Sequence, residues 1–264
     1  MSYLYEMHLH TSQGSLCGRS TGKEHAQYYK ENGYQGIIIT DHFFGGNTTA
    51  PKELPWRDRI EMFCKGYEDA LEEGKRIGLD VFFGWEQNFE LDEYLVYGLD
   101  KQWLLDHPEM EHWTRKQQLE EVHRYGGCVI QAHPFRDRGY IPKILLGKRF
   151  SDGIEVANAG QFPYNDAAAL RYAQEYDLLM IAGSDNHLSN GEKWQPDKLM
   201  GIELENRLEN IGDLVSIIRN RGPIGLHVPE GRFTVQPEDQ LKVEVCWLDE
   251  NENAIPDHRE WLHI

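Results

Sequence analysis

Hydrophobic positions along the chain follow two different periods, which alternate over most of its length. Short apolar and partly β-branched runs, such as GIIITDH at residues 36–42, are typical of buried parallel strands. Between them lie stretches whose apolar residues recur at helical spacing and which end at glycine, as at Gly33 and Gly78. The pattern predicts strands at 3–10, 36–42, 81–86, 94–99, 128–133, 153–157, 178–184 and 201–204, and helices at 21–32, 58–77, 114–125, 165–175 and 212–220.

This order of elements predicts a closed or nearly closed α/β barrel with its active site at the C-terminal ends of the strands. Parallel strands need helical crossovers, and roughly seven or eight such steps suit a barrel better than the alternative, an open doubly wound sheet. Residues 1–222 form the predicted barrel. Residues 223–264 do not continue its alternation of strands and helices, and we expect a strand at 242–248 and a hairpin near Pro256. We expect the second segment to pack on the barrel as an appendage rather than as a domain. The Gly/Pro/Thr-rich segment 43–56 is long enough for a lid.

Composition narrows the classes of function. The 264 residues carry 44 acidic against 27 basic side chains, a formal charge of −17, which opposes binding of nucleic acid other than a small nucleotide or oligonucleotide substrate. No run approaches the ~20 apolar residues of a membrane helix, and the start of the chain has no signal-peptide pattern. The four cysteines show no C-x₂-C pairing, so we expect reduced thiols in a cytoplasmic protein.

The chemistry-bearing residues stand at the ends of the predicted strands. In a parallel barrel all these ends meet on one face, so residues far apart in sequence would lie together there. The residues concerned are His8 and His10, Asp41 and His42, Glu86, His133, Glu155, and Asp185 with His187.

Their spacing predicts a metal cluster. Residues i and i+2 of a strand point to the same side, so His8 and His10 can share a cation, as can Asp185 and His187. Of the adjacent Asp41–His42 pair we expect His42 to be the ligand and Asp41 to orient a ligating imidazole. Mixed imidazole and carboxylate ligands suit Zn²⁺, Mn²⁺ or Fe²⁺, and eight candidates suit two or three ions, with Glu86 as the natural bridge. We expect the other seven histidines to be surface residues: His25, His107, His112, His123, His227, His258 and His263.

As a set, these motifs resemble the PHP family (polymerase and histidinol phosphatase domain). They read HLH (8–10), TDH (40–42), GWE (84–86), AHP (132–134) and SDNH (184–187), in family order. The resemblance implies a distorted (β/α)₇ barrel, up to three metal ions and hydrolysis of phosphate esters. It also implies that His8, His10, Glu86 and Asp185 hold one ion, His42 and His187 a second, and Glu86 with His133 a third.

The chain departs from the family pattern at two positions. Where members often carry an Asp or His shortly after H-x-H, this chain has Ser15, with Cys17 close by. The histidine expected on strand four is absent from EYLVYGL. The sequence therefore does not decide between two and three ions, and Ser15, Cys17 and Glu155 are candidates for ligands or for groups that orient them.

The predicted function is that of a metal-dependent phosphoesterase acting on a small phosphorylated substrate. Glu86, Asp185 and His187 are the expected catalytic residues, with His187 or a metal-bound water assisting the leaving group, and Arg136 and Arg19 the expected phosphate-binding residues. An amidohydrolase is the alternative, although strand four offers no lysine and the last motif is D-x-H. A non-catalytic, regulatory metal-binding domain is the third reading. Substrate identity and oligomeric state are not predicted.

Overall fold

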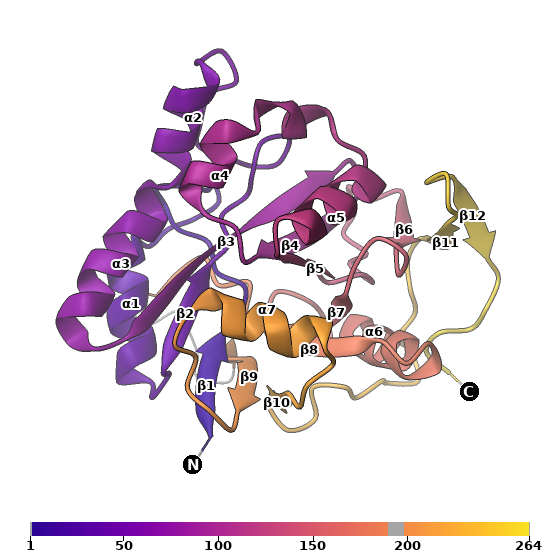
Figure 1. Ribbon diagram of the computed structural model, residues 1–264. Coiled ribbons are helices and arrows are strands. Elements are labelled where there is room, and N and C mark those ends of the chain that lie inside the picture. Colours follow the sequence, from indigo (N-terminus) through magenta and orange to yellow (C-terminus); the bar gives the residue numbers. More distant parts are fainter. Residues whose placement is uncertain (1, 190–197, 264) are drawn as a thin grey trace.

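A nine-stranded sheet curls into a nearly closed barrel in the computed structural model, which describes residues 2–189 and 198–263 (Figure 1). The strand order in this sheet is β10-β9-β1-β2-β3-β4-β5-β7-β8. Its strands are β1 (Tyr3–Glu6), β2 (Gly36–Ile39), β3 (Asp80–Phe89), β4 (Asp92–Tyr97), β5 (Cys128–Gln131), β7 (Gly153–Asn158), β8 (Leu179–Gly183), β9 (Gly201–Leu204) and β10 (Gly225–His227). The α/β barrel class predicted from the sequence is confirmed.

Helices cover the outer face of the sheet. They are α1 (Gly22–Glu31), α2 (Trp56–Phe63), α3 (Lys65–Ile77), α4 (Lys101–Asp106), α5 (Arg115–Arg124), α6 (Pro163–Glu175) and α7 (Ile211–Arg219), with a short 3₁₀ helix η1 (Pro108–His112). The helix predicted at 58–77 is two helices that meet at Cys64, and α3 ends at Gly78 in the left-handed conformation that glycine favours. No helix in the described part of the chain is long and apolar enough to cross a membrane.

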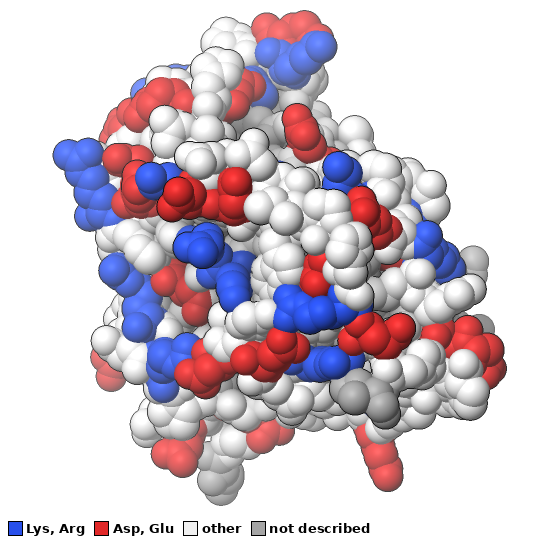
Figure 2. Space-filling view, turned by 90° about the vertical axis from the view of Figure 1, so that its right-hand side faces the viewer, with Lys and Arg blue, Asp and Glu red and all other residues white. Residues whose placement is uncertain are grey.

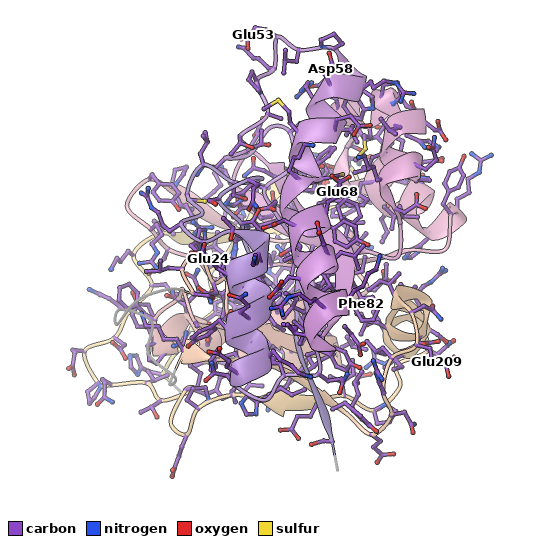
Figure 3. All side chains as sticks on the ribbon, turned by 90° about the vertical axis from the view of Figure 1, so that its left-hand side faces the viewer. Glu24, Glu53, Asp58, Glu68, Phe82 and Glu209 are labelled. Carbon is purple, nitrogen blue, oxygen red and sulfur yellow. The ribbon has the colours of Figure 1, made fainter. Side chains whose placement is uncertain are left out.

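Helices α1 and α3 lie side by side over the first strands (Figure 3). Thr21 and Glu24 form a capping box that starts α1. The helices approach closely because the contact points are glycines: a Cβ on Gly22 would lie 2.0 Å from the carbonyl oxygen of Gly66. A Cβ on Gly66 would in turn lie 1.9 Å from Oγ1 of Thr11, so this face of α3 sits directly against the loop that follows β1.

Strand direction differs from the sequence prediction at two places. Strands β1, β2 and β3 are parallel to one another, and so are β5, β7 and β8, but β4 is antiparallel to both β3 and β5. Strand β9 is antiparallel to β1. The expectation that the strand at 94–99 runs parallel was wrong, because only the two-residue turn Glu90-Leu91 separates β3 from β4 and a parallel connection needs a crossover of a dozen residues or more. The amino end of β4 therefore lies beside the carboxyl ends of β3 and β5.

The barrel closes between its first and its last parallel strand just beyond their ends. Leu9 and Asn186 form an isolated parallel bridge, in which the His10 N–H donates to the Asn186 carbonyl at 2.9 Å. At the other end β9 pairs with β1, and β10 pairs with β9. Residues on both sides of position 222 thus contribute strands to the main sheet.

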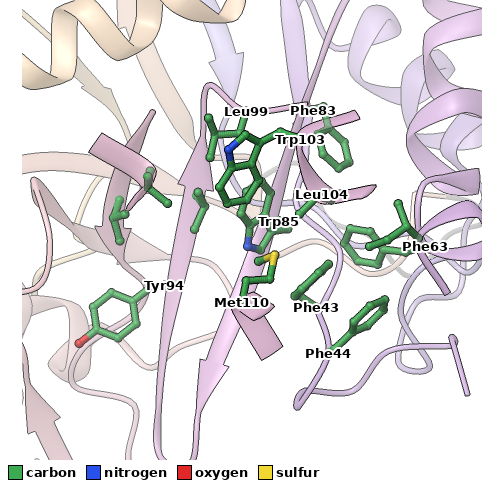
Figure 4. Packing of buried hydrophobic residues seen from close by; sticks show 14 of the residues in the cluster. Phe43, Phe44, Phe63, Phe83, Trp85, Tyr94, Leu99, Trp103, Leu104 and Met110 are labelled. Carbon is green, nitrogen blue, oxygen red and sulfur yellow. The ribbon is translucent and has the colours of Figure 1, made fainter. Parts of the chain in front are cut away.

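An aromatic-rich core packs against the outer side of β3 and β4 (Figure 4). Trp85 is fully buried and stacks on Trp103 of α4 at 6.0 Å between ring centroids. Phe43 and Phe44, which begin the segment expected to be a lid, are buried in the same cluster and stack on each other at 4.2 Å. The start of that segment is therefore anchored in the core.

The C-terminal residues add a small second sheet of order β12-β11-β6, made of β6 (Lys143–Leu146), β11 (Glu244–Leu248) and β12 (Ala254–Asp257). Trp261 is buried against Phe135 and Tyr172 of α6. On the face of the molecule shown in Figure 2, acidic and basic side chains are interspersed rather than gathered into one basic band.

Candidate metal centre

The predicted ligands do converge at one end of the barrel. His8 and His10 follow β1, His42 follows β2, and His42 forms an isolated parallel bridge with Glu86 of β3. His133 follows β5 and Asp185 follows β8, both with positive φ (25° and 51°). Such a conformation is uncommon for residues other than glycine, and here it turns the chain directly after a strand.

Glu86 lies at the centre of the cluster, and its carboxylate faces four imidazoles. Its Oε2 is 2.7 Å from Nδ1 of His42 and 3.5 Å from Nε2 of His10. Its Oε1 is 3.1 Å from Nε2 of His133 and 3.3 Å from Nε2 of His8. The side chain is 1% exposed, so these contacts take the place of solvent around the carboxylate.

Asp185 faces the same histidines from the last parallel strand. Its Oδ1 is 3.0 Å from Nε2 of His10 and 3.6 Å from Nε2 of His8. His187 lies next to it, with Nδ1 2.7 Å from the Asp185 carbonyl oxygen. That bond requires a proton on Nδ1, so the Nε2 lone pair of His187 is the one available to a ligand.

At the two carboxylates of this cluster, burial and the neighbouring histidines shift the pKa in opposite directions. Burial raises the pKa of Glu86, but His42 and His8 outweigh it and hold the pKa well below its usual value. Asp185 behaves alike, with burial opposed mainly by His8 and His10. Burial and the neighbouring His42 and His187 lower the pKa of His10, which is therefore neutral and can donate a lone pair to a cation.

Three further predicted residues hold the ligands from outside. Glu155 does not face the interior of the cluster: it contacts Nδ1 of His8 at 3.0 Å and accepts from the His133 N–H at 3.0 Å. Asp41, expected to orient a ligating imidazole, makes no direct hydrogen bond to one among the described residues. It accepts from the Ser15 hydroxyl at 2.7 Å, and Ser15 Oγ lies 3.2 Å from Nδ1 of His10, so Asp41 acts on the imidazole through Ser15.

His25 corrects the expectation that the remaining histidines lie on the surface. It is fully buried on α1. Its two ring nitrogens lie 2.7 Å from Ser189 Oγ and 2.9 Å from the His10 carbonyl oxygen, so both have hydrogen-bond partners. Burial lowers its pKa to about 4, so this imidazole is neutral in the folded protein. His25 thus fixes the backbone of a predicted ligand.

Glu93 was missed by the sequence reasoning. It stands at the start of β4, paired in register with Asn88, and its Oε2 lies 3.5 Å from Nε2 of His133 while Oε1 lies 3.9 Å from Nδ1 of His42. The antiparallel direction of β4 brings it to the site. The signal that could have found it is the short interval between the two predicted strands, which leaves no room for a helix.

Beside the cluster lies an open cavity of about 420 Å³, within the range of small-molecule sites. Arg136 lines it, with Nη1 2.6 Å from Glu93 Oε2 and Nη2 2.5 Å from the hydroxyl of the exposed Tyr140. Cys17 lines it too, with its sulfur 3.1 Å from Nε2 of His187. Arg19, the other predicted phosphate-binding residue, is exposed and is not among the residues that line this cavity, although its backbone N–H donates to the His187 carbonyl.

The donor set fits divalent cations. Four groups of three side chains each offer ligand atoms within 4.8 Å of one another: His8/His10/Asp185, His8/Glu86/His133, His42/Glu86/Glu93 and His10/His42/His187. Nδ1 of His42 and Oε2 of Glu86 are buried and 2.7 Å apart, yet neither has a hydrogen-bond partner in the described part of the chain. Buried polar atoms are normally satisfied, and a cation shared by the two would satisfy both.

Comparison with known proteins gives a clear fold and a limited sequence match. No protein-family model matches the chain. A 5′–3′ exoribonuclease from Haemophilus influenzae is 30% identical over 104 residues, which are 38% of this chain and 35% of that protein. The match thus spans about a third of the length of this curated relative.

Solved structures align over most of the chain. A two-domain protein from Bacteroides vulgatus containing a predicted PHP-like metal-dependent phosphoesterase aligns with a TM-score of 0.67 at 15% identity, over 87% of this chain and 66% of that one. PsfC from Pseudomonas syringae gives 0.55 at 15% identity over 88% and 93%, and a candidate metal-dependent phosphoesterase from Bifidobacterium adolescentis gives 0.51 at 17% over 83% and 96%. This chain therefore has the fold of the PHP-like metal-dependent phosphoesterases, the family whose motifs its sequence resembles.

Proposed function

We propose that this chain is a metal-dependent phosphoesterase that hydrolyses a small phosphorylated substrate in the cavity beside Glu86. The observation that carries the proposal is the convergence of four imidazoles on one buried carboxylate, with an arginine on the wall of the same cavity. Guanidinium groups bind phosphate bidentately, which is the recognition such a substrate needs.

The contacts suggest how the ions would be held. One ion would be bound by His8, His10, Glu86 and Asp185; a second by Glu86, His133 and Glu93; a third by His42 and His187. Ligands of these types suit Zn²⁺, Mn²⁺ or Fe²⁺. Divalent cations in such a cluster lower the pKa of water and offset negative charge on a phosphoryl group.

The protein's own groups supply binding and orientation. Arg136 is paired with Glu93 and Tyr140, and its remaining N–H groups can bind a phosphate oxygen in the cavity. His187 has one nitrogen committed to the Asp185 carbonyl, so its other nitrogen can ligate a cation or deliver a proton, but not both. We assign it to the cation, because His42 and His10 offer ligand atoms within 4.8 Å of its own.

The substrate class rests on three facts. The cavity is of a size for one nucleotide-like group, the overall charge is −17, and the matched relative is named as an exoribonuclease. Together they favour a small phosphate ester or a short single-stranded end over duplex nucleic acid. An amidohydrolase activity is less well supported, since no lysine is among the described residues that line the cavity.

The test is a hydrolysis screen on metal-free protein reloaded with Mn²⁺, Zn²⁺ or Fe²⁺. The panel holds phosphate monoesters, diesters, cyclic phosphates, short 5′-phosphorylated RNA and amide substrates. We expect metal-dependent release from at least one phosphate ester, with Arg136→Ala raising KM roughly tenfold because a charge-assisted hydrogen bond is lost. Arg124→Ala, on the exposed side of α5, serves as control. Turnover of amides alone, or no turnover at full metal occupancy, would overturn the proposal.

A further inference from the structure

The loop after β1 brings a thiol, rather than a carboxylate or an imidazole, to the outer end of the cluster. Ser15 is not available to a cation in this loop, since its hydroxyl donates to Asp41 and accepts from the His42 N–H at 3.0 Å. It also lies on the Nδ1 side of His10, away from Nε2, which faces Asp185. The next polar side chain of the loop that points into the cavity is Cys17.

Cys17 lies beside two predicted ligands. Its sulfur is 3.1 Å from Nε2 of His187, the nitrogen not committed to the Asp185 carbonyl, and it lines the same cavity as His42. Both histidines, with His10, belong to one group whose ligand atoms lie within 4.8 Å of one another. The Cys17 thiol therefore faces the same space as two imidazoles that could share an ion.

The backbone holds Cys17 in this position from both sides. The Leu16 N–H donates to the Asn47 carbonyl and the Arg19 N–H to the His187 carbonyl, at 2.9 and 2.7 Å. Gly18 has no room for a side chain, because its Cβ would lie 2.2 Å from the Thr11 carbonyl oxygen. The loop is thus fitted tightly against the segment after β1 that carries His10 and Thr11.

The other cysteines differ from Cys17 in their surroundings. Cys64, Cys128 and Cys246 are buried, and each belongs to a hydrophobic cluster. None of them lines the cavity. Within the described part of the chain, Cys17 is the cysteine placed among the clustered histidines.

We propose that the sulfur of Cys17 is a metal ligand, joining His42 and His187 at one position of the cluster and making that position selective for Zn²⁺ over Mn²⁺. Thiolates favour Zn²⁺ and other soft or borderline ions, while Mn²⁺ prefers oxygen ligands. On binding, the S–H bond breaks, the proton passes to solvent and the sulfur forms the bond to the metal. The inference rests on the proposed function only in that divalent ions occupy the cluster.

The geometry needs little adjustment. Zinc–sulfur and zinc–nitrogen bonds of about 2.3 and 2.0 Å in a tetrahedral site place the two ligand atoms about 3.5 Å apart. The sulfur of Cys17 and Nε2 of His187 are 3.1 Å apart, so the two side chains have to separate by only a few tenths of an ångström. Rotation about the cysteine side chain is enough for that change.

The test is spectroscopic and independent of hydrolysis. Protein loaded with Co²⁺ should show a sulfur-to-cobalt charge-transfer band in the near ultraviolet, and Cys17→Ser should abolish it. Cys246→Ala, which removes a thiol remote from the cavity, should keep the band. Titration with a competing chelator should show at least a tenfold loss of affinity for one Zn²⁺ in Cys17→Ser, with Mn²⁺ binding unchanged.

Two further measurements complete the test. Zn²⁺ should protect Cys17 from alkylation in the folded protein but not in the denatured protein, as measured by mass spectrometry of peptides. Cys17→Asp should shift the preference of the site toward Mn²⁺. A cobalt band that survives in Cys17→Ser, or equal Zn²⁺ affinity in that variant and the wild type, would overturn the inference. Either result would leave the proposed hydrolysis standing, because hydrolysis is measured separately.

Discussion

The two sides of the cavity are built in different ways. On the parallel side, formed by β1, β7 and β8, the ligands His8 and His10 are buried and held from behind by residues that never reach the cavity. On the hairpin side, formed by β3 and β4, Glu93 is held from the front by Arg136, which itself lines the cavity. The comparison teaches that the parallel side is preorganised before any ion binds. On the hairpin side, ion binding and substrate binding both involve the paired side chains of Glu93 and Arg136.

The strongest way to break this arrangement is at Glu86, where the two sides meet. Glu86→Gln keeps the size of the side chain but removes its charge, so up to two ions lose a ligand. We expect turnover to fall by roughly 10²–10³, the cost of losing one important transition-state group. The protein should still fold, because the amide fills nearly the same volume as the carboxylate that it replaces.

The measurement is turnover with added Mn²⁺ or Zn²⁺, together with metal content and melting temperature. A Glu86→Gln variant with wild-type turnover at full metal occupancy would show that Glu86 does not bridge ions.

Glu155→Gln tests whether the parallel side depends on support from behind. The substitution replaces one of the two carboxylate oxygens with an NH2 group, which cannot accept a hydrogen bond, so the contact with Nδ1 of His8 or the bond from the His133 N–H is lost. Groups in such positions typically contribute 10–100-fold to metal affinity, and we expect a loss in that range. Isothermal titration of Zn²⁺ measures it, with Glu203→Gln on β9, a partly exposed glutamate, as the matched control. Equal losses in both variants would show that the effect is not specific to the site.

Glu93→Gln sharpens the comparison from the other side. Because Glu93 contacts His133 and His42 at longer distances than Glu86 does, we expect about a tenfold loss of affinity, confined to one ion. The same change also releases Arg136 from its partner, so KM for a phosphate ester should change together with metal affinity. On the parallel side no such coupling is expected. A Glu93→Gln variant that changes neither quantity would place Glu93 outside the site.

His25 provides the smallest and most local test of the preorganised side. Its pKa is lowered to about 4 by burial, against a usual value near 6.5. Between these values the unfolded chain binds a proton that the folded chain does not, so stability is present above pH 6.5 and is lost as pH falls toward 4. For one proton the loss is at most about 1.4 kcal/mol per pH unit.

Urea unfolding of metal-free wild type and His25→Gln, each at several pH values from 7.5 to 4.5, measures this difference in slope. The variant should show a flatter dependence on pH. Identical slopes would mean that His25 titrates alike in the folded and unfolded chain.

The sequence predicted the parallel part of the site well and the hairpin part poorly, for a physical reason. H-x-H and D-x-H spacing is a local property of an extended chain, so His8 could be paired with His10, and Asp185 with His187, without knowing the fold. The predicted parallel barrel then placed the two pairs on one face. Glu93 could not, because its contribution depends on strand direction, and the strands of the predicted barrel were all taken to be parallel. The seven residues 87–93 between the predicted strands could have shown the error, since they are too few for a crossover.

Contacts made by loops also could not be predicted from the sequence pattern. Whether Asp41 touches an imidazole or Ser15 depends on how the loop after β1 folds back, which is set by close packing at Gly14 and Gly18. His25 was assigned to the surface by default because a single histidine on a polar helix gives no sign of burial. Its contact with the His10 carbonyl joins elements that only the tertiary structure brings together.

The closure of the barrel by Leu9 and Asn186 has a mechanical consequence. The seam between the start and the end of the parallel sheet runs between His8 and His10 on one edge and Asp185 and His187 on the other. An ion bound by residues from both edges would cross-link two parts of the chain that are far apart in sequence. Binding would then protect the backbone amides on both edges from exchange with solvent, and removing the ions would open the barrel first along this line.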